Sequence, residues 1–100
     1  MIAYFTPKSS TFDYLNEVIM TKAEFLKQLG LAIAKQREKK KLTQTEVAYK
    51  CDFERGNLTR IEKGKSNVTA ESLLKISEAI GVPVSKFFQF HEKALKKLKD

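Results

Sequence analysis

The chain has 100 residues, the length of one compact domain, which leaves no room for a catalytic domain beside a separate sensory one. Its 19 lysine and arginine residues outnumber 12 aspartate and glutamate residues, and the formal net charge of +7 favours a polyanionic partner, above all nucleic acid. No apolar run approaches the roughly 18 residues of a membrane span, and no secretory signal pattern is present. We therefore expect a cytoplasmic, nucleoid-associated protein without a membrane partner.

Residue chemistry argues against an enzyme or a metalloprotein. With Cys51 as the only cysteine and His91 as the only histidine, an internal disulfide is impossible and no ordinary metal site can be assembled. No pattern sets a nucleophile beside a base and an orienting group. We predict no enzymatic activity, no metal and no cofactor. Cys51 is expected to be a packed thiol rather than a redox sensor, and His91 a solvated side chain.

Residues 1–20 read as an N-terminal extension with a composition of their own. They hold four aromatic residues and only three charged ones. Tyr14, Leu15, Val18 and Ile19 have helical spacing. The extension is equally compatible with a loosely packed terminus and with a contact to a second subunit.

The first predicted helix runs from Thr21 to about Lys40. Thr21 and Glu24 have the spacing of a capping box, in which a threonine side chain and a glutamate side chain each accept a hydrogen bond from the other's backbone N–H. Apolar residues and Arg37 then recur at intervals of three and four. The end of this helix is basic. We expect solvated charge at Lys39 and Lys40 and keep a phosphate contact open for Lys41.

A pair of short helices is predicted between Thr43 and Gly64. Thr43 and Glu46 form a second capping-box pattern, and Val47, Ala48 and Cys51 give the first helix of the pair a small apolar face. The dipeptide at 52–53 interrupts the pattern, and the second helix is predicted for about 54–63. Leu58 and Ile61 face inward there, which leaves Arg55, Gly56, Thr59 and Arg60 outward.

The remaining elements are a helix over 70–80, a short fifth helix and a tail. Thr69 is placed to cap the fourth helix and Gly81 to end it. Pro83 starts the fifth helix, whose Val84, Phe87 and Phe88 are expected to close the core. Residues 90–100 form a basic amphipathic tail that could extend this helix, pair with another subunit or lie on a membrane, the last being the least favoured. We expect domain limits of 1–20, 21–89 and 90–100.

Three motifs in order resemble the Cro and phage-repressor type of helix-turn-helix domain, a five-helix, all-α family often called XRE-like. The motifs are LTQTEVA at 42–48, LTRIEKGK at 58–65 and LLKISEAIGV at 73–82. The resemblance extends over some sixty residues, from about Leu26 to Phe88. It implies a protein that binds double-stranded DNA, with the second helix of the pair in the major groove and the first across the backbone. Because one such helix reads only a few base pairs, we also expect a homodimer.

The resemblance also implies roles for individual residues. Base edges would be read by Arg55, Gly56, Thr59 and Arg60. Phosphates would be contacted by Gln44, Lys63, Lys65 and Asn67, in addition to the contact kept open for Lys41. Arg37 and Glu62 match family positions that pair across the first and third helices, and we predict a largely buried ion pair between them.

Three residues depart from the family pattern. Asp52 stands where glycine is common in the turn, although aspartate tolerates the left-handed conformation. Glu54 stands where a serine or threonine cap is usual. Gly56 weakens the second helix of the pair by about 1 kcal/mol relative to alanine. Without a side chain it reads no base by hydrogen bonding, so it either permits a close approach to DNA or is incidental.

The sequence thus predicts a sequence-specific, repressor-like transcriptional regulator. Two alternatives stay open. One is an antitoxin-like interaction module whose terminal segments bind a partner protein, with DNA binding secondary. The other is non-specific coating of nucleic acid, which would be steeply salt-dependent without sequence preference.

Overall fold

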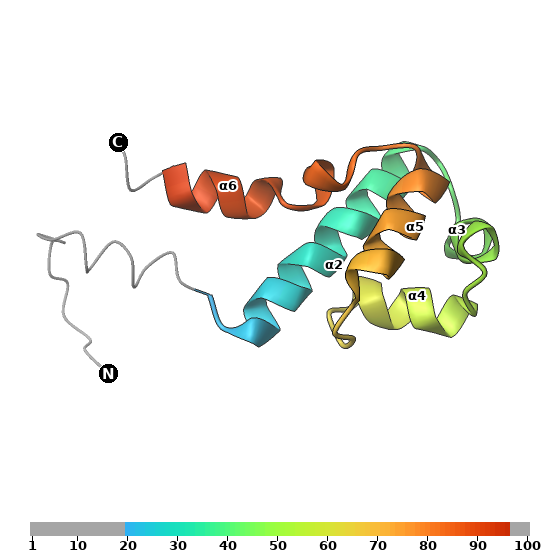
Figure 1. The fold of residues 1–100 in the computed structure, drawn as a ribbon, viewed down its shortest axis with the longest axis horizontal. Coiled ribbons are helices and arrows are strands. Elements are labelled where there is room, and N and C mark those ends of the chain that lie inside the picture. Colours follow the sequence, from blue (N-terminus) through green and yellow to red (C-terminus); the bar gives the residue numbers. More distant parts are fainter. Residues whose placement is uncertain (1–19, 97–100) are drawn as a thin grey trace, which may run out of the picture.

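The computed structural model describes residues 20–96, which form helices joined by short loops (Figure 1). The elements are α2 (Lys22–Lys39), α3 (Gln44–Cys51), α4 (Arg55–Glu62), α5 (Ala70–Ile80), the 3-10 helix η1 (Val84–Phe87) and α6 (Gln89–Lys96). The all-α prediction is confirmed, since no strand occurs in this part of the chain. The expected packing of residues 1–19 lies outside the described residues.

Helix starts follow the capping signals of the sequence. At α2 the Glu24 N–H donates to Thr21 Oγ1 at 3.1 Å, and the Thr21 N–H donates back to Glu24 Oε1 at 2.9 Å. The same box at α3 has distances of 3.0 and 2.8 Å between Thr43 and Glu46. Each backbone hydrogen bond to a carboxylate favours its charged form, so the pKa values of Glu24 and Glu46 lie below the usual range.

Helix ends use residues in the left-handed conformation, which lets the next backbone N–H groups turn back onto the last free carbonyls. Gly64 and Gly81 have φ angles of 74° and 87°, as expected of glycine. Lys41 and Asp52 adopt φ of 59° at the ends of α2 and α3. Asp52 therefore adopts the left-handed conformation that it was predicted to tolerate. The same conformation at Lys41 was not predicted.

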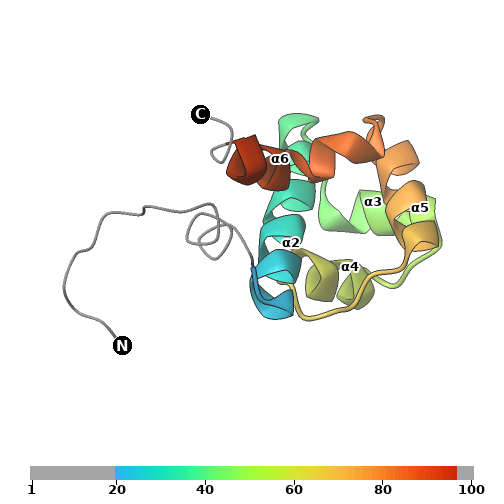
Figure 2. The same cartoon turned by 60° about the vertical axis from the view of Figure 1, so that its left-hand side comes forward.

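The core lies where α2, α3, α4 and α5 meet, closed by η1 (Figure 2). Its largest fully buried side chains are those of Phe87, Ile33, Leu58, Ile76 and Val47. Phe87 is 0% exposed, so it closes the core as predicted. Cys51 is also buried, and this burial raises the pKa of its thiol, as expected for a packed side chain.

A close backbone approach fixes α4 against α2. A Cβ atom placed on Gly30 would lie 2.4 Å from the backbone oxygens of both Ile61 and Glu62. No side chain fits at that distance. Gly30 therefore lets the end of α4 rest directly on the middle of α2, and this contact sets the position of the α3–α4 pair.

The C-terminal part has a short fifth helix and a helical tail, as expected, and the tail does not continue the fifth helix. Residue Phe88 separates η1 from α6, and α6 turns back beside α2 (Figure 1). Phe90 and His91 lie on Phe25, with ring centroids 5.4 and 5.8 Å from its centroid. The expectation that His91 is solvated was wrong, because this packing leaves it half-buried.

Candidate nucleic-acid interface

The α3–α4 pair is held at its turn by Asp52, whose left-handed conformation ends α3. Its N–H donates to the Tyr49 carbonyl at 3.1 Å, and the next N–H, of Phe53, donates to the Ala48 carbonyl at 2.8 Å. Glu54 then stands at the N-cap of α4, but its side chain makes no capping hydrogen bond. The hydrogen bonds of the turn are thus made between backbone groups, and the side chain of Glu54 remains exposed.

One side of α4 is buried and the other is free. Leu58, Ile61 and Glu62 are buried against the core. Arg55, Gly56 and Arg60 are exposed and Thr59 is half-buried, so the residues predicted to read bases do share the outer side of this helix. A guanidinium matches the two acceptors of guanine in the major groove.

Asn57 belongs to this exposed face, although the sequence reasoning did not select it. Its side-chain oxygen accepts a hydrogen bond from Arg60 Nη2, three residues further along the helix. An asparagine can itself pair with both adenine groups exposed in the major groove. The spacing of three between an asparagine and an arginine was the signal that could have indicated it.

Below the exposed face, Arg37 and Glu62 form a bidentate ion pair between α2 and α4. Arg37 Nε donates to Glu62 Oε2 at 2.7 Å, and Arg37 Nη2 donates to Oε1 at 3.0 Å. The side chains are only 11% and 5% exposed. Arg37 Nη1 also donates to the Leu42 carbonyl at 2.8 Å. The hydrogen bonds from the guanidinium to Glu62 raise the pKa of Arg37.

Gln44 links this ion pair to the outer face of α4. Its Nε2 donates to Glu62 Oε1 at 2.8 Å, and its Oε1 accepts from Thr59 Oγ1 at 3.0 Å. The amide of Gln44 is therefore oriented from both ends, and Thr59 is held by it. Gln44 lies at the first position of α3, where backbone N–H groups are also free to meet a phosphate.

The other residues predicted to contact phosphates are exposed at the two ends of the helix pair. Lys41, Gln44 and Arg55 line one shallow hollow at the start of α3. Lys63, Lys65 and Asn67 are exposed beyond the end of α4. Asn67 shares a smaller hollow with Asn57. The site thus has a basic patch at either end of α4, without a metal-binding cluster among residues 20–96.

Two short helices joined by a tight turn and packed on a small helical core, with arginines on the free side of the second helix, define a helix-turn-helix domain. The helix-turn-helix family model matches residues 33–87, and the chain belongs to this family. It is a family of DNA-binding transcriptional regulators rather than of enzymes. None of the helices within 20–96 is both long and apolar enough to cross a bilayer.

Curated relatives include control proteins. The chain is 38% identical over 58 residues to the control protein C.MunI of a Mycoplasma species, a match that covers 58% of this chain and 78% of that one. It is 35% identical over 52 residues to the control protein C.BamHI of Bacillus amyloliquefaciens, covering 52% of this chain and 64% of that one. The match thus spans slightly less than two thirds of C.BamHI.

Solved structures give the same picture. The restriction-modification controller protein C.Esp1396I superposes with a TM-score of 0.63 at 32% identity, covering 73% of this chain and 95% of that chain. The same protein has been solved as a tetramer in complex with its natural 35-base-pair operator, with a TM-score of 0.62 at 31% identity over 70% of this chain and 92% of that one. The controller C.AhdI from Aeromonas hydrophila has a TM-score of 0.62 at 25% identity over 63% and 96%.

Proposed function

We propose that this protein is a transcriptional regulator that binds operator DNA as a homodimer and reads each half-site with α4. The observation that carries the proposal is the outer face of α4, where Arg55, Asn57 and Arg60 are exposed above a rigid base. That base includes the Arg37–Glu62 pair and the oriented amide of Gln44. Preorganised side chains on a rigid helix are what base recognition requires.

In this proposal Arg55, Asn57 and Arg60 contact the base edges and so read the sequence. Thr59 would contribute a hydroxyl held by Gln44, and Gly56 a close backbone approach. Lys41, Gln44, Lys63, Lys65 and Asn67 would bind phosphates on either side and fix the register of α4 in the groove.

The proposed homodimer follows from the size of the reading element. An eight-residue α4 contacts only a few base pairs. Two copies reading half-sites about one helical turn apart reach the affinity that specific regulators have. The operator complex of C.Esp1396I is assembled from several copies, which supports this part of the proposal.

The relatives favour a more specific role, the control of restriction-modification genes. C.BamHI and C.MunI are control proteins, and C.Esp1396I and C.AhdI are restriction-modification controllers. If this role is correct, sites bound in fragmented DNA of the source organism will lie upstream of a methyltransferase or endonuclease gene. Bound sites confined to unrelated promoters would support a general regulator instead.

The proposed role of α4 is tested by the double substitution Arg55→Ala/Arg60→Ala on duplexes recovered by selection with the wild-type chain. Each lost arginine–guanine pair removes about 1–3 kcal/mol of discrimination, so the preference for the selected duplex over a scrambled one should fall roughly tenfold or more per arginine. Fluorescence anisotropy at fixed salt measures both affinities.

The control is Lys86→Ala/Lys93→Ala, which removes the same charge from residues that line a groove between α2 and α6. It should weaken binding to both duplexes slightly and leave their ratio unchanged. An arginine variant that keeps the full preference would contradict the assignment of base reading to α4.

A further inference from the structure

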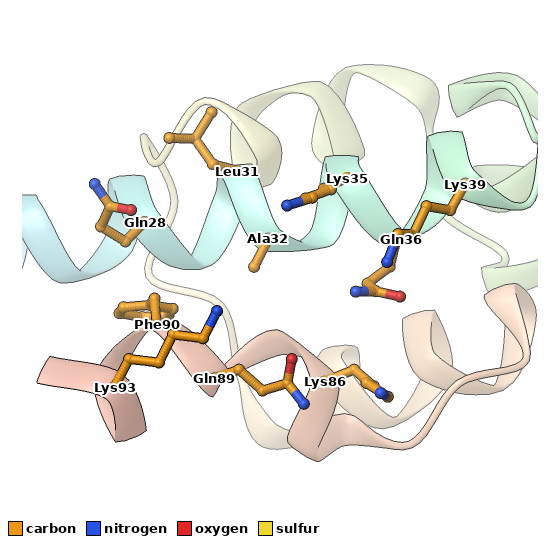
Figure 3. A pocket seen from close by; sticks show the side chains of 10 residues that line it. All are labelled: Gln28, Leu31, Ala32, Lys35, Gln36, Lys39, Lys86, Gln89, Phe90 and Lys93. Atoms are coloured by element: carbon orange, nitrogen blue, oxygen red, sulfur yellow. The ribbon is translucent and has the colours of Figure 1, made fainter. Parts of the chain in front are cut away.

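A groove runs between α2 and α6, away from the helix pair assigned to DNA. It has a volume of about 400 Å³. In Figure 3, Ala32 of α2 and Phe90 of α6 point into the space between the two helices. Along α2 it extends from Gln28 to Lys39, about 16 Å at the rise of an α-helix.

The apolar side chains that point into the groove are those of Ala32 and Phe90 (Figure 3). Both are only half-buried, and they form a small apolar floor between polar side chains. Leu31, which is 52% exposed, lies at the rim of the groove. An apolar floor gains nothing from a bare phosphate backbone, but it would gain from leucine-like side chains laid on it.

The walls are basic. Lys35 and Lys39 of α2 lie on one side of the groove and Lys86 and Lys93 on the other (Figure 3). Among residues 20–96, no aspartate or glutamate lines it. Four ammonium groups around one hollow raise the local potential and attract carboxylates. Apolar floor and basic walls together are complementary to a segment that is both apolar and acidic.

The groove is on the opposite side of α2 from the reading helix. Gly30 and Arg37 face α4. At about 100° per residue, Lys35 lies roughly 140° and Lys39 roughly 180° round the helix from Gly30. A partner in the groove would therefore leave α4 free to bind DNA.

We propose that this groove binds an acidic, amphipathic helical segment of a partner protein, about three turns long. Its apolar side chains lie on Ala32 and Phe90, and its carboxylates lie beside the four lysines. This is the helix-in-groove mode of recognition, in which spacings of three and four along the segment match the floor. The protein thus joins operator DNA on one side to a second protein on the other.

The test uses the full chain and a labelled probe peptide of about 14 residues, made of leucine and glutamate with leucines at helical spacing. Fluorescence anisotropy measures binding, and a control peptide has the same composition in scrambled order. The ordered peptide should bind at least tenfold more tightly than the scrambled one. Lys35→Glu/Lys93→Glu should weaken it tenfold or more, whereas Lys22→Glu/Lys50→Glu, with the same charge change outside the groove, should change its affinity less than twofold.

Three outcomes would overturn the proposal. Equal binding of both peptides would mean that only overall charge is sensed. Displacement of the peptide by duplex DNA would assign the groove to the DNA interface. Amide shifts at Leu31 and Lys35 in NMR spectra that appear on concentrating the chain alone would show that a second copy occupies it.

Discussion

Among single residues, Gly30 and Gly56 differ in whether the fold leaves space for a side chain. Gly30 has no space for a side chain, because a Cβ there would lie 2.4 Å from two backbone oxygens. At Gly56, a Cβ would meet only Arg60 Nη1, at 3.8 Å, which is an ordinary contact. The fold therefore requires glycine at position 30 but not at position 56.

Gly56→Ala should consequently separate stability from binding. Alanine favours a helix by about 1 kcal/mol over glycine, which corresponds to a rise in Tm of roughly 4–8 °C for a domain of this size. A methyl group between α4 and the base edges should at the same time weaken operator binding tenfold or more. Thermal melts and anisotropy measure the two effects, with Gly30→Ala, which should lower Tm, for comparison. Unchanged operator affinity would show that α4 does not approach DNA closely at this position.

Glu62 is the residue on which the buried network depends. Glu62→Ala leaves Arg37 without its carboxylate and removes the acceptor of the Gln44 amide. Breaking one partner of a buried pair costs about 3–5 kcal/mol. The control is Glu38→Ala. Glu38 Oε2 lies 3.7 Å from Arg37 Nη2, but the Glu38 side chain is 69% exposed. Exposed ion pairs contribute about 0–1 kcal/mol to stability. Urea unfolding of both variants measures the difference. Equal, small changes would contradict a structural role for the pair.

The residue scale is also where sequence reasoning reached its limit. The Arg37–Glu62 contact was anticipated because both residues match positions that pair in the family that the chain resembles. The hydrogen bonds of Gln44 to Glu62 and Thr59 were not, because neither such a match nor a local signal indicates them. The packing need at Gly30 was equally invisible, since it depends on how closely two helices approach.

At the scale of elements, local signals predicted most of the fold. Threonine caps, apolar spacing and glycine ends placed α2, α3 and α5 within a residue or two of their observed limits. The separate helix after η1 agrees with the expected helical tail. The position of α6 beside α2 was not predicted, because it follows from the packing of Phe88 and Phe90 on Phe25 rather than from a local signal.

The capping boxes make helix starts sensitive to acid. Glu24 and Glu46 have lowered pKa values in the folded state, so their contribution to stability is present above about pH 4.5 and is lost as pH falls through the folded-state pKa. Glu24→Gln/Glu46→Gln keeps an acceptor for the N-cap but removes the titration. The fall of Tm below pH 4.5 should therefore be shallower in this variant. Glu78→Gln, an exposed change outside the boxes, should keep the wild-type profile, and identical profiles for all three chains would refute the coupling.

At the scale of the whole molecule, the domain places two surfaces on opposite sides of α2. The exposed face of α4 carries the arginines proposed to read DNA, and the groove with α6 carries an apolar floor between lysines. The net charge of +7 indicated a polyanionic partner but not where on the surface the basic residues gather. That groove depends on the return of α6 along α2, which only the folded structure reveals.

Sequence-specific reading of DNA by a dimer can be tested by selecting bound sites from random duplex DNA with the full chain. We expect enrichment of one site with two inverted half-sites about one helical turn apart, each with guanines at the positions that Arg55 and Arg60 meet. Binding without enrichment of any sequence, lost steeply with salt, would contradict it and would identify a non-specific nucleic-acid binder.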